Sequence, residues 1–330
     1  MLSTDDVINI SKQINDLKAL EEKYDAMQNK VFNDIANSLQ YFNKIYRPIL
    51  ANADKYPLFS MHYPYYNLKR LINYAIEFFK LMGNDVYELY KRLQNKELIL
   101  EKDQTSYGGL CWNINGHLSS IILYTNSTNL YKIIALVHEI GHAYDNYLNR
   151  THDYKLDVQI NSEITSITFE HLFIKFLMDE KLLKEEDAKI IYHNFFTQHI
   201  KLMHEAYIYN NLVMNNIIWP GKNFLIIEEK DKTIIKKYSI MKSNMLSKDI
   251  QSIKAESNEY AIGTLVSFIM MNHYTQNKLD AIKEIKDLSM FSQVSNTEDI
   301  LNLITKLGSI DIINKNTYKI LIKNKKHLSA

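Results

Sequence analysis

The sequence predicts a mainly α-helical protein with a small antiparallel β-sheet. Only 8 glycines and 4 prolines occur in 330 residues, and this scarcity of helix-breaking residues favours helices. Apolar residues recur at helical spacing along much of the chain, whereas residues 107–126 carry β-branched and aromatic residues at strand-like spacing. With 46% hydrophobic residues, the chain is long enough to bury a substantial core.

Helices are expected first over residues 4–47, where polar residues can cap the first turn and apolar residues follow at helical spacing until Pro48. A second helical region is expected over 67–95, with a break near Gly83. The stretch 98–100 then has the composition of a short strand.

The predicted sheet comes next. The stretches YGGLCWNIN and SSIILYTN suit two strands, and the dipeptide Asn115-Gly116 between them is a good hairpin turn. Helices are expected again over about 129–149 and about 160–179. Residues 223–240 alternate weakly, which favours a second hairpin, and the rest of the chain is expected to be helical.

Composition excludes several classes of partner. The 39 basic and 38 acidic residues give a net charge of +1. This nearly neutral balance does not predict binding to nucleic acid or to an anionic membrane. The most apolar stretch, 261–271, is too short to span a bilayer. The opening residues MLSTDDVINI lack the basic and apolar regions of a signal peptide, so none is expected, and the single cysteine, Cys111, predicts a reducing compartment, the cytoplasm.

The stretch LVHEIGHAYDNYL, residues 136–148, predicts a metal site. His138 and His142 are four residues apart, so on a helix both imidazoles lie on one face and can bind one Zn²⁺. Glu139 is placed to take a proton from a metal-bound water rather than to bind the metal. Gly141 would let another segment approach closely. The alternative is an ordinary helix that happens to carry two histidines.

A third protein ligand completes the prediction, because catalytic zinc takes three protein ligands and keeps one open position. Glu163 follows His142 by 21 residues, and a helix returning over that distance can bring it back. The set is then His₂Glu, which favours one zinc per chain over Mn²⁺ or Co²⁺. Glu170, two helical turns after Glu163, is either an acceptor for a ligand histidine or a solvated glutamate. Asp145 has the same two interpretations.

Several segments resemble the oligoendopeptidase F and thimet oligopeptidase family of zinc metallopeptidases. In chain order they are NYAIEFFKLMGNDVYELYKRL, SYGGLCW, SIILYTNST, LVHEIGHAYDNYL and NSEITSITFEHL, with a weaker match at EYAIGTLVSF. The resemblance covers roughly residues 65–178 and a short piece near residue 260. It implies that Glu163, in the pattern Glu163-Ile-Thr-Ser166, is the third zinc ligand.

The resemblance also implies a fold and an activity. The fold is a helical, gluzincin-type zinc-metallopeptidase with the small sheet beside the active-site cleft. The activity is endopeptidase cleavage of short peptides, which bind by strand addition at the sheet edge, near Gly108, Gly109 and Leu110. Tyr260 matches the tyrosine that donates a hydrogen bond to the oxyanion. The alternative for Tyr260 is an aromatic residue packed in the core.

The sequence also departs from the family. Asp145 stands where the family often has a further histidine, and no histidine precedes Tyr260 at the usual spacing. His204 can substitute if its helix lines the cleft. The resemblance begins near residue 65, so we divide the chain into an N-terminal helical segment, 1–65, and a catalytic unit, 66–330. Because family members are usually longer, we expect a reduced N-terminal wall of the channel.

The sequence is therefore consistent with three functions. The first is a zinc-dependent metalloendopeptidase acting on short peptides. The second is a helical zinc carboxypeptidase, which would need a cation, Arg70, Arg92 or Arg150, to hold the substrate carboxylate. The third is a catalytically weak peptide-binding protein on the same scaffold. The oligomeric state is left open.

Overall fold

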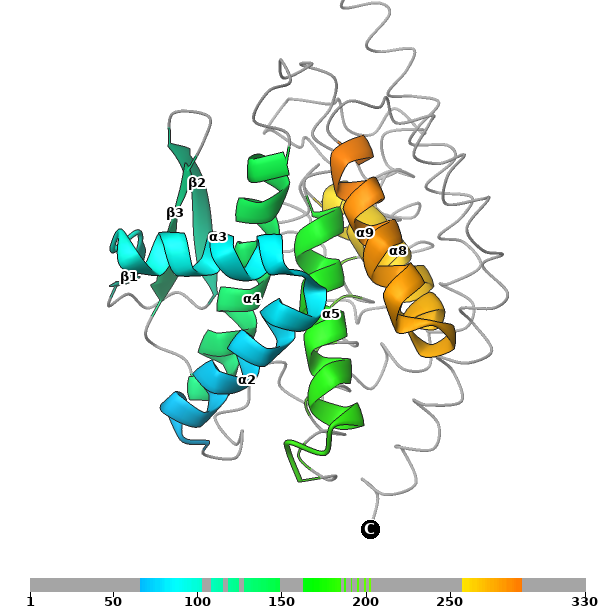
Figure 1. Ribbon diagram of the computed structural model, residues 1–330, viewed down its shortest axis with the longest axis horizontal. Coiled ribbons are helices and arrows are strands. Elements are labelled where there is room, and N and C mark those ends of the chain that lie inside the picture. The colour runs from blue at the N-terminus through cyan, green and yellow to red at the C-terminus, as the bar shows by residue number, and fades with distance from the viewer. Residues whose placement is uncertain are drawn as a thin grey trace, which may run out of the picture.

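The computed structural model describes residues 66–102, 108–114, 118–124, 128–148, 163–184 and 257–292, together with the single positions 187, 191, 195, 199 and 202. Its elements are α2 (Leu68–Met82), α3 (Asn84–Asn95), β1 (Ile99–Lys102), β2 (Gly109–Ile114), β3 (Leu118–Tyr124), α4 (Asn129–Leu148), α5 (Ile164–Asp179), α8 (Ser257–Gln276) and α9 (Lys278–Ser292) (Figure 1). A mainly helical fold with a small sheet is confirmed.

The predicted break at Gly83 is confirmed, and glycine is needed there. The helix α2 starts where the Asn67 side chain accepts a hydrogen bond from the Arg70 backbone N–H at 3.2 Å. It ends at Gly83, whose φ of +143° is open to glycine but costly for other residues. The chain then turns directly into α3. The helical region expected over 67–95 is therefore two helices that meet at an angle (Figure 1).

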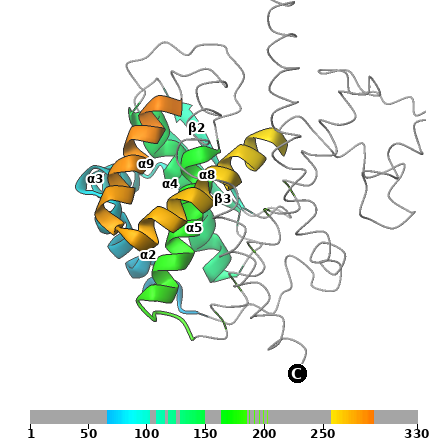
Figure 2. The same ribbon diagram turned by 90° about the vertical axis from the view of Figure 1, so that its right-hand side faces the viewer.

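Helix α4 lies at the centre of the described structure. It contacts β2 and β3 on one side and α5 on the other, and α5 in turn contacts α8 (Figures 1 and 2). Both α4 and α5 are buried around almost their whole circumference. A helix buried on all sides is apolar on all sides, so polar residues within it need partners inside the protein.

The sheet is mixed, so the expectation of a purely antiparallel sheet is wrong. The strand order is β1-β3-β2, with β2 antiparallel to β3 and β1 parallel to it. The hairpin leaves one edge of β3 free, and β1 takes that edge, where Ile121 N–H donates to Leu98 O at 2.8 Å. The direction of β1 depends on this long-range placement, because a strand has the same side-chain alternation whichever way it runs.

Several predictions fall outside the described residues. These are the N-terminal segment 1–65, the hairpin over 223–240, the turn at Asn115-Gly116 and His204. In the part of the chain that the structure describes, every helix is too short or too polar to cross a membrane.

Candidate metal centre and cleft

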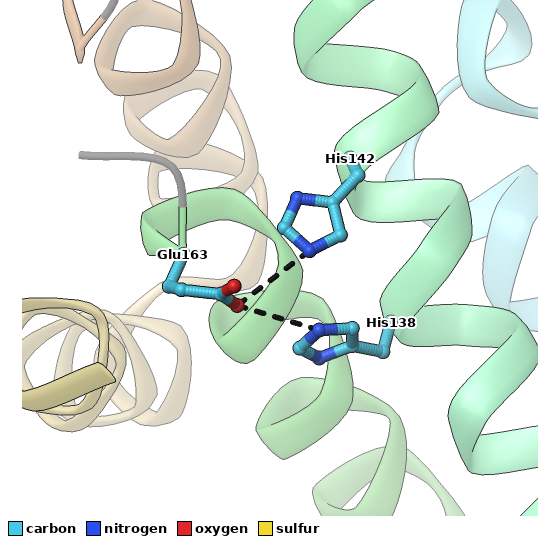
Figure 3. Close-up of side chains that lie close together, drawn as sticks. All are labelled: His138, His142 and Glu163. Carbon is cyan, nitrogen blue, oxygen red and sulfur yellow. Dashed lines mark ion pairs between the residues drawn. The ribbon is translucent and has the colours of Figure 1, made fainter. Parts of the chain in front are cut away.

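Two histidines on α4 and one glutamate from α5 converge (Figure 3). The rings of His138 and His142 lie one turn apart on the same face of α4, with centroids 4.9 Å apart. Figure 3 shows both rings directed at the carboxylate of Glu163, which occupies the N-cap position of α5. The sequence pattern therefore leads to one cluster, as its spacing predicted.

The spacing of the three side chains fits a tetrahedral ion. Glu163 Oε2 lies 3.4 Å from His138 Nε2 and 3.5 Å from His142 Nε2, and all three ligand atoms fall within 4.8 Å of one another. Donors on a tetrahedral zinc with bonds of about 2.0–2.1 Å are roughly 3.3–3.4 Å apart. Ser166 Oγ donates to Glu163 Oε2 at 3.0 Å and so holds the carboxylate in place.

Two glycines allow the helices to approach closely enough to bring Glu163 to the histidines. A Cβ atom on Gly141 of α4 would lie 2.6 Å from Ser166 Cα of α5. A Cβ atom on Gly263 of α8 would lie 2.5 Å from the backbone oxygen of Glu163. Both contacts would be with backbone atoms, which cannot rotate away. The position of Glu163 therefore depends on both residues being glycine. The close approach expected at Gly141 is confirmed.

Glu170 contacts the outer nitrogen of His138. Its Oε2 lies 2.9 Å from His138 Nδ1, and its side chain is buried beside the cluster rather than solvated. With Nδ1–H donating to this carboxylate, Nε2 is the nitrogen that faces Glu163 and would bind a metal. This is the arrangement in which carboxylates orient metal-binding histidines in other proteins.

Charges and burial shift the acidity of the cluster. Burial, together with the charges of Glu163 and Glu170, raises the pKa of Glu139 to about 7 against the opposing effect of His138. Burial disfavours the charged form of His138, but hydrogen bonds to Glu163 and Glu170 outweigh it and hold its pKa well above the usual range. Burial likewise opposes ionisation of Glu163, yet His142 and His138 lower its pKa.

A cavity of about 370 Å³ opens beside the cluster. It is lined by Gly108, Gly109, Tyr131, Ile134, Ala135, His138, Glu139, Glu170, Phe195, His199, Leu202 and Tyr260. The cavity thus joins the predicted catalytic residues Glu139 and Tyr260 to the sheet side of the site. A Cβ atom on Gly109 would lie 2.7 Å from Glu139 Cγ, so β2 passes directly against the candidate base.

The other predicted residues are placed differently. Leu110 is 37% exposed and is not among the cavity-lining residues, since alternate residues of a strand face opposite sides of the sheet. Asp145 is buried and accepts hydrogen bonds from Ser289 Oγ at 2.6 Å and Thr165 Oγ1 at 3.3 Å, linking α4 to α9 and α5. Burial raises the pKa of the Cys111 thiol to about 12, which keeps it a neutral thiol.

Six cavity residues were missed by the sequence argument: Tyr131, Ile134, Ala135, Phe195, His199 and Leu202. Tyr131 and Phe195 stack with ring centroids 5.8 Å apart and form an aromatic wall. Phe195 and His199 are one helical turn apart, but this spacing alone does not tell which face of a helix meets the cavity. No signal in the sequence singled out His199 from the other histidines.

Comparison with known proteins identifies the fold. No protein-family model matches the sequence, and no curated protein matches it. A structure assigned as an oligoendopeptidase F from Bacillus anthracis str. Ames matches with a TM-score of 0.56 and 17% identity over 81% of this chain and 47% of its own. A structure assigned as a peptidase from Chlamydophila abortus matches with a TM-score of 0.63 and 14% identity, over 91% of this chain and 55% of its own.

A third solved structure, of PZ peptidase A with an inhibitor, matches with a TM-score of 0.59 and 14% identity over 89% of this chain and 58% of its own. The chain therefore spans about half the length of the solved structures it matches. Identities this low establish the fold alone, and it is the fold of oligoendopeptidase-type peptidases. The resemblance found in the sequence is confirmed at that level.

Proposed function

We propose that this protein is a zinc-dependent metalloendopeptidase that hydrolyses short peptides. The observation that carries the proposal is the convergence of three potential zinc ligands, His138, His142 and Glu163, beside a cavity that also presents Glu139 and Tyr260. The fold, shared with solved peptidases, supports the same conclusion. Each residue of the site has a distinct task in this proposal.

The metal ligands come from two helices that contact each other directly. His138 and His142 would bind through Nε2 and Glu163 through Oε2, since each of these nitrogens already lies at the spacing of a tetrahedral site from Oε2. Glu170 would fix the ring of His138 by accepting from its Nδ1–H. A zinc ion bound here would supply Lewis acidity, polarising the peptide carbonyl and making bound water acidic near neutral pH.

Glu139 is the proposed proton carrier. Its carboxylate lines the cavity, is buried, and has a pKa of about 7, close to the pH at which it must both accept and release a proton. It would take the proton from the attacking water and deliver it to the leaving amine. Tyr260 lines the same cavity, and its hydroxyl would donate a hydrogen bond to the carbonyl oxygen as negative charge develops there.

The substrate would bind along β2. Among the described strands β2 pairs with β3 alone, so its other edge offers backbone N–H and C=O groups to a peptide. Gly108 and Gly109 line the cavity, and Gly109 lies against Glu139. A peptide added to this edge would therefore run past the candidate base with its backbone close to it.

The cavity favours internal cleavage over removal of C-terminal residues. Within the described part of the chain, no lysine or arginine lines it. Arg70 and Arg92 are exposed on α2 and α3, and Arg150 lies outside the described residues. A carboxypeptidase needs a cation to bind the terminal carboxylate of its substrate, and the described walls offer none. An endopeptidase has no such requirement.

The decisive experiment combines metal analysis with a peptide assay. The zinc content of the purified protein is measured, and a mixed pool of peptides of about ten residues is followed by mass spectrometry. Glu139→Gln is the test variant and Glu88→Gln, an exposed glutamate on α3, is its matched control. We expect one zinc per chain and internal cleavages that disappear in Glu139→Gln alone.

Other results would redirect the proposal. Release of single C-terminal residues would indicate a carboxypeptidase. Zinc without cleavage in any variant would favour a peptide-binding protein. A protein that takes up no zinc would show that His138 and His142 are ordinary helix residues.

A further inference from the structure

A chain of three buried polar side chains lies behind the candidate metal centre. His171 Nε2 is 2.9 Å from His199 Nδ1, and His171 Nδ1 is 3.0 Å from Ser267 Oγ. All three side chains are buried. His171 lies on α5 and Ser267 on α8, and His199 is a helical residue outside the labelled elements. Neither His171 nor His199 belongs to the cluster that could hold the metal.

The hydrogen bonds in this chain run in one direction. The backbone oxygen of Phe195 can only accept, so His199 Nδ1 is a donor, and Ser267 Oγ can give its own hydrogen to the backbone oxygen of Thr264 at 2.8 Å while it accepts from His171. His171 therefore carries its hydrogen on Nδ1, and its Nε2 accepts. The N–H of His199 thus points at both His171 Nε2 and the backbone oxygen of Phe195, the latter 2.9 Å away.

This direction leaves the other nitrogen of His199 without a hydrogen. Burial lowers the pKa of both histidines, so each ring is neutral and has one N–H. That of His199 is committed to Nδ1, and its Nε2 keeps a free lone pair. The chain from Ser267 to His199 thus fixes a tautomer at its far end, as second hydrogen bonds commonly do for histidine.

The free nitrogen lies near another acceptor, in a residue that lines the cavity. His199 Nε2 lies 4.0 Å from Glu170 Oε1, and both residues line the cavity. Two acceptors cannot bond to each other, and Glu170 uses its other oxygen for His138. Both residues line the cavity, so a donor that enters the cavity can bond to these two acceptors.

We propose that His199 contacts the substrate, with its Nε2 accepting a hydrogen bond from a backbone N–H of the bound peptide. This inference rests on the proposed peptidase function and extends it. An N–H donor fits between two acceptors, whereas a carboxylate or phosphate would be repelled by Glu170. The contact would give the peptide backbone a second point of attachment in the cavity besides the sheet edge at Gly109.

Two substitutions distinguish the roles of Nδ1 and Nε2 of His199. In His199→Asn the side-chain amide can still donate to Phe195 O, but nothing replaces Nε2. In His199→Gln the longer amide reaches the position of Nε2 and can accept there. His273→Asn on α8 is the matched control, because His273 pairs with Glu284 away from the cavity-lining residues.

We expect kcat/KM for a cleaved decapeptide to fall about threefold to tenfold in His199→Asn, the loss of one hydrogen bond between neutral groups. His199→Gln should retain more activity than His199→Asn although it loses the buried Nδ1 donor and should melt at the lower temperature of the two, and zinc content should match the wild type in both. The reverse ranking, or a loss confined to zinc content and stability, would overturn the proposal.

An NMR experiment tests the inference independently of any peptide cleavage. Protein with ¹⁵N-labelled histidine is loaded with zinc in the Glu139→Gln background, and the His199 signals are assigned by their absence in His199→Asn. We expect an Nδ1–H tautomer whose Nε2 signal shifts when a synthetic apolar decapeptide is added. An Nε2–H tautomer, or an Nε2 signal that ignores a bound peptide, would refute the role of His199 and leave the peptidase assignment untouched.

Discussion

Replacing Gly141 by alanine should separate the two helices that carry the metal ligands. The new Cβ would lie 2.6 Å from Ser166 Cα, whereas ordinary contact begins at 3.4 Å, so α5 must retreat by about 0.8 Å. Alanine in place of a helical glycine contributes roughly 1 kcal/mol of stability by itself. Overpacking against backbone costs up to about 3 kcal/mol, so we expect a net loss of about 2 kcal/mol.

The same retreat should weaken metal binding. Glu163 stands only three residues before Ser166, and metal–ligand distances tolerate errors of about 0.2 Å. A retreat of about 0.8 Å exceeds that tolerance, so we expect zinc affinity to fall at least tenfold, a loss typical even of changes around the ligands.

Two assays separate these effects. Urea unfolding in the presence of a chelator measures packing without the metal, and competition with a zinc-binding dye measures affinity. Gly263→Ala, which would meet the backbone oxygen of Glu163 from α8, should reproduce both losses. A Gly141→Ala protein that is as stable as the wild type and binds zinc equally well would refute the argument from close helix packing.

Three further changes test other parts of the site and fold. Tyr260→Phe should lower kcat by about 10²–10³ while zinc content is unchanged, because only the proposed oxyanion donor is removed; a rate within twofold of the wild type would show that its hydroxyl does not stabilise the oxyanion. Glu170→Gln should weaken zinc binding by about 10–100-fold in the dye competition, and unchanged affinity would show that its contact with His138 is not needed. Asp85→Asn should lower the free energy of unfolding by about 1 kcal/mol at pH 7, since the carboxylate accepts from Tyr144 at 2.6 Å and Lys286 at 2.7 Å. Burial opposes ionisation of Asp85, but these bonds lower its pKa, so its contribution is present above the unfolded value of about 3.9 and is lost as pH falls through the folded value. The gap between wild type and variant in urea unfolding should therefore close in acid, and a gap that widens there would contradict the sign.

Local patterns predicted the elements that surround the site. Helix α4 was expected over about 129–149 and spans Asn129–Leu148, because a polar break precedes it and helical periodicity runs through it. The same periodicity places His138 and His142 on one face. Glu163 was reached by combining the need for a third ligand with the family resemblance, and the structure brings its carboxylate to both histidines.

Features that depend on contacts distant in sequence could not be predicted. The parallel direction of β1 depends on which edge of β3 is free. From sequence alone Asp145 was either an acceptor for a ligand histidine or a solvated side chain, because its partners Thr165 and Ser289 come from two later helices. His199 gave no signal for the same reason: it lines a cavity whose other walls come from residues distant in sequence.

The origin of the metal ligands in two neighbouring helices has a consequence for the order of folding. His138, His142 and Glu163 are supplied by one short stretch of chain, and α4 and α5 pack directly on each other. Loops of this size close quickly and at small entropic cost. Tyr260 arrives on α8, far later in the sequence, and must dock onto α5. During refolding, zinc uptake should therefore precede the return of enzymatic activity, and the interval between them would time the docking of α8.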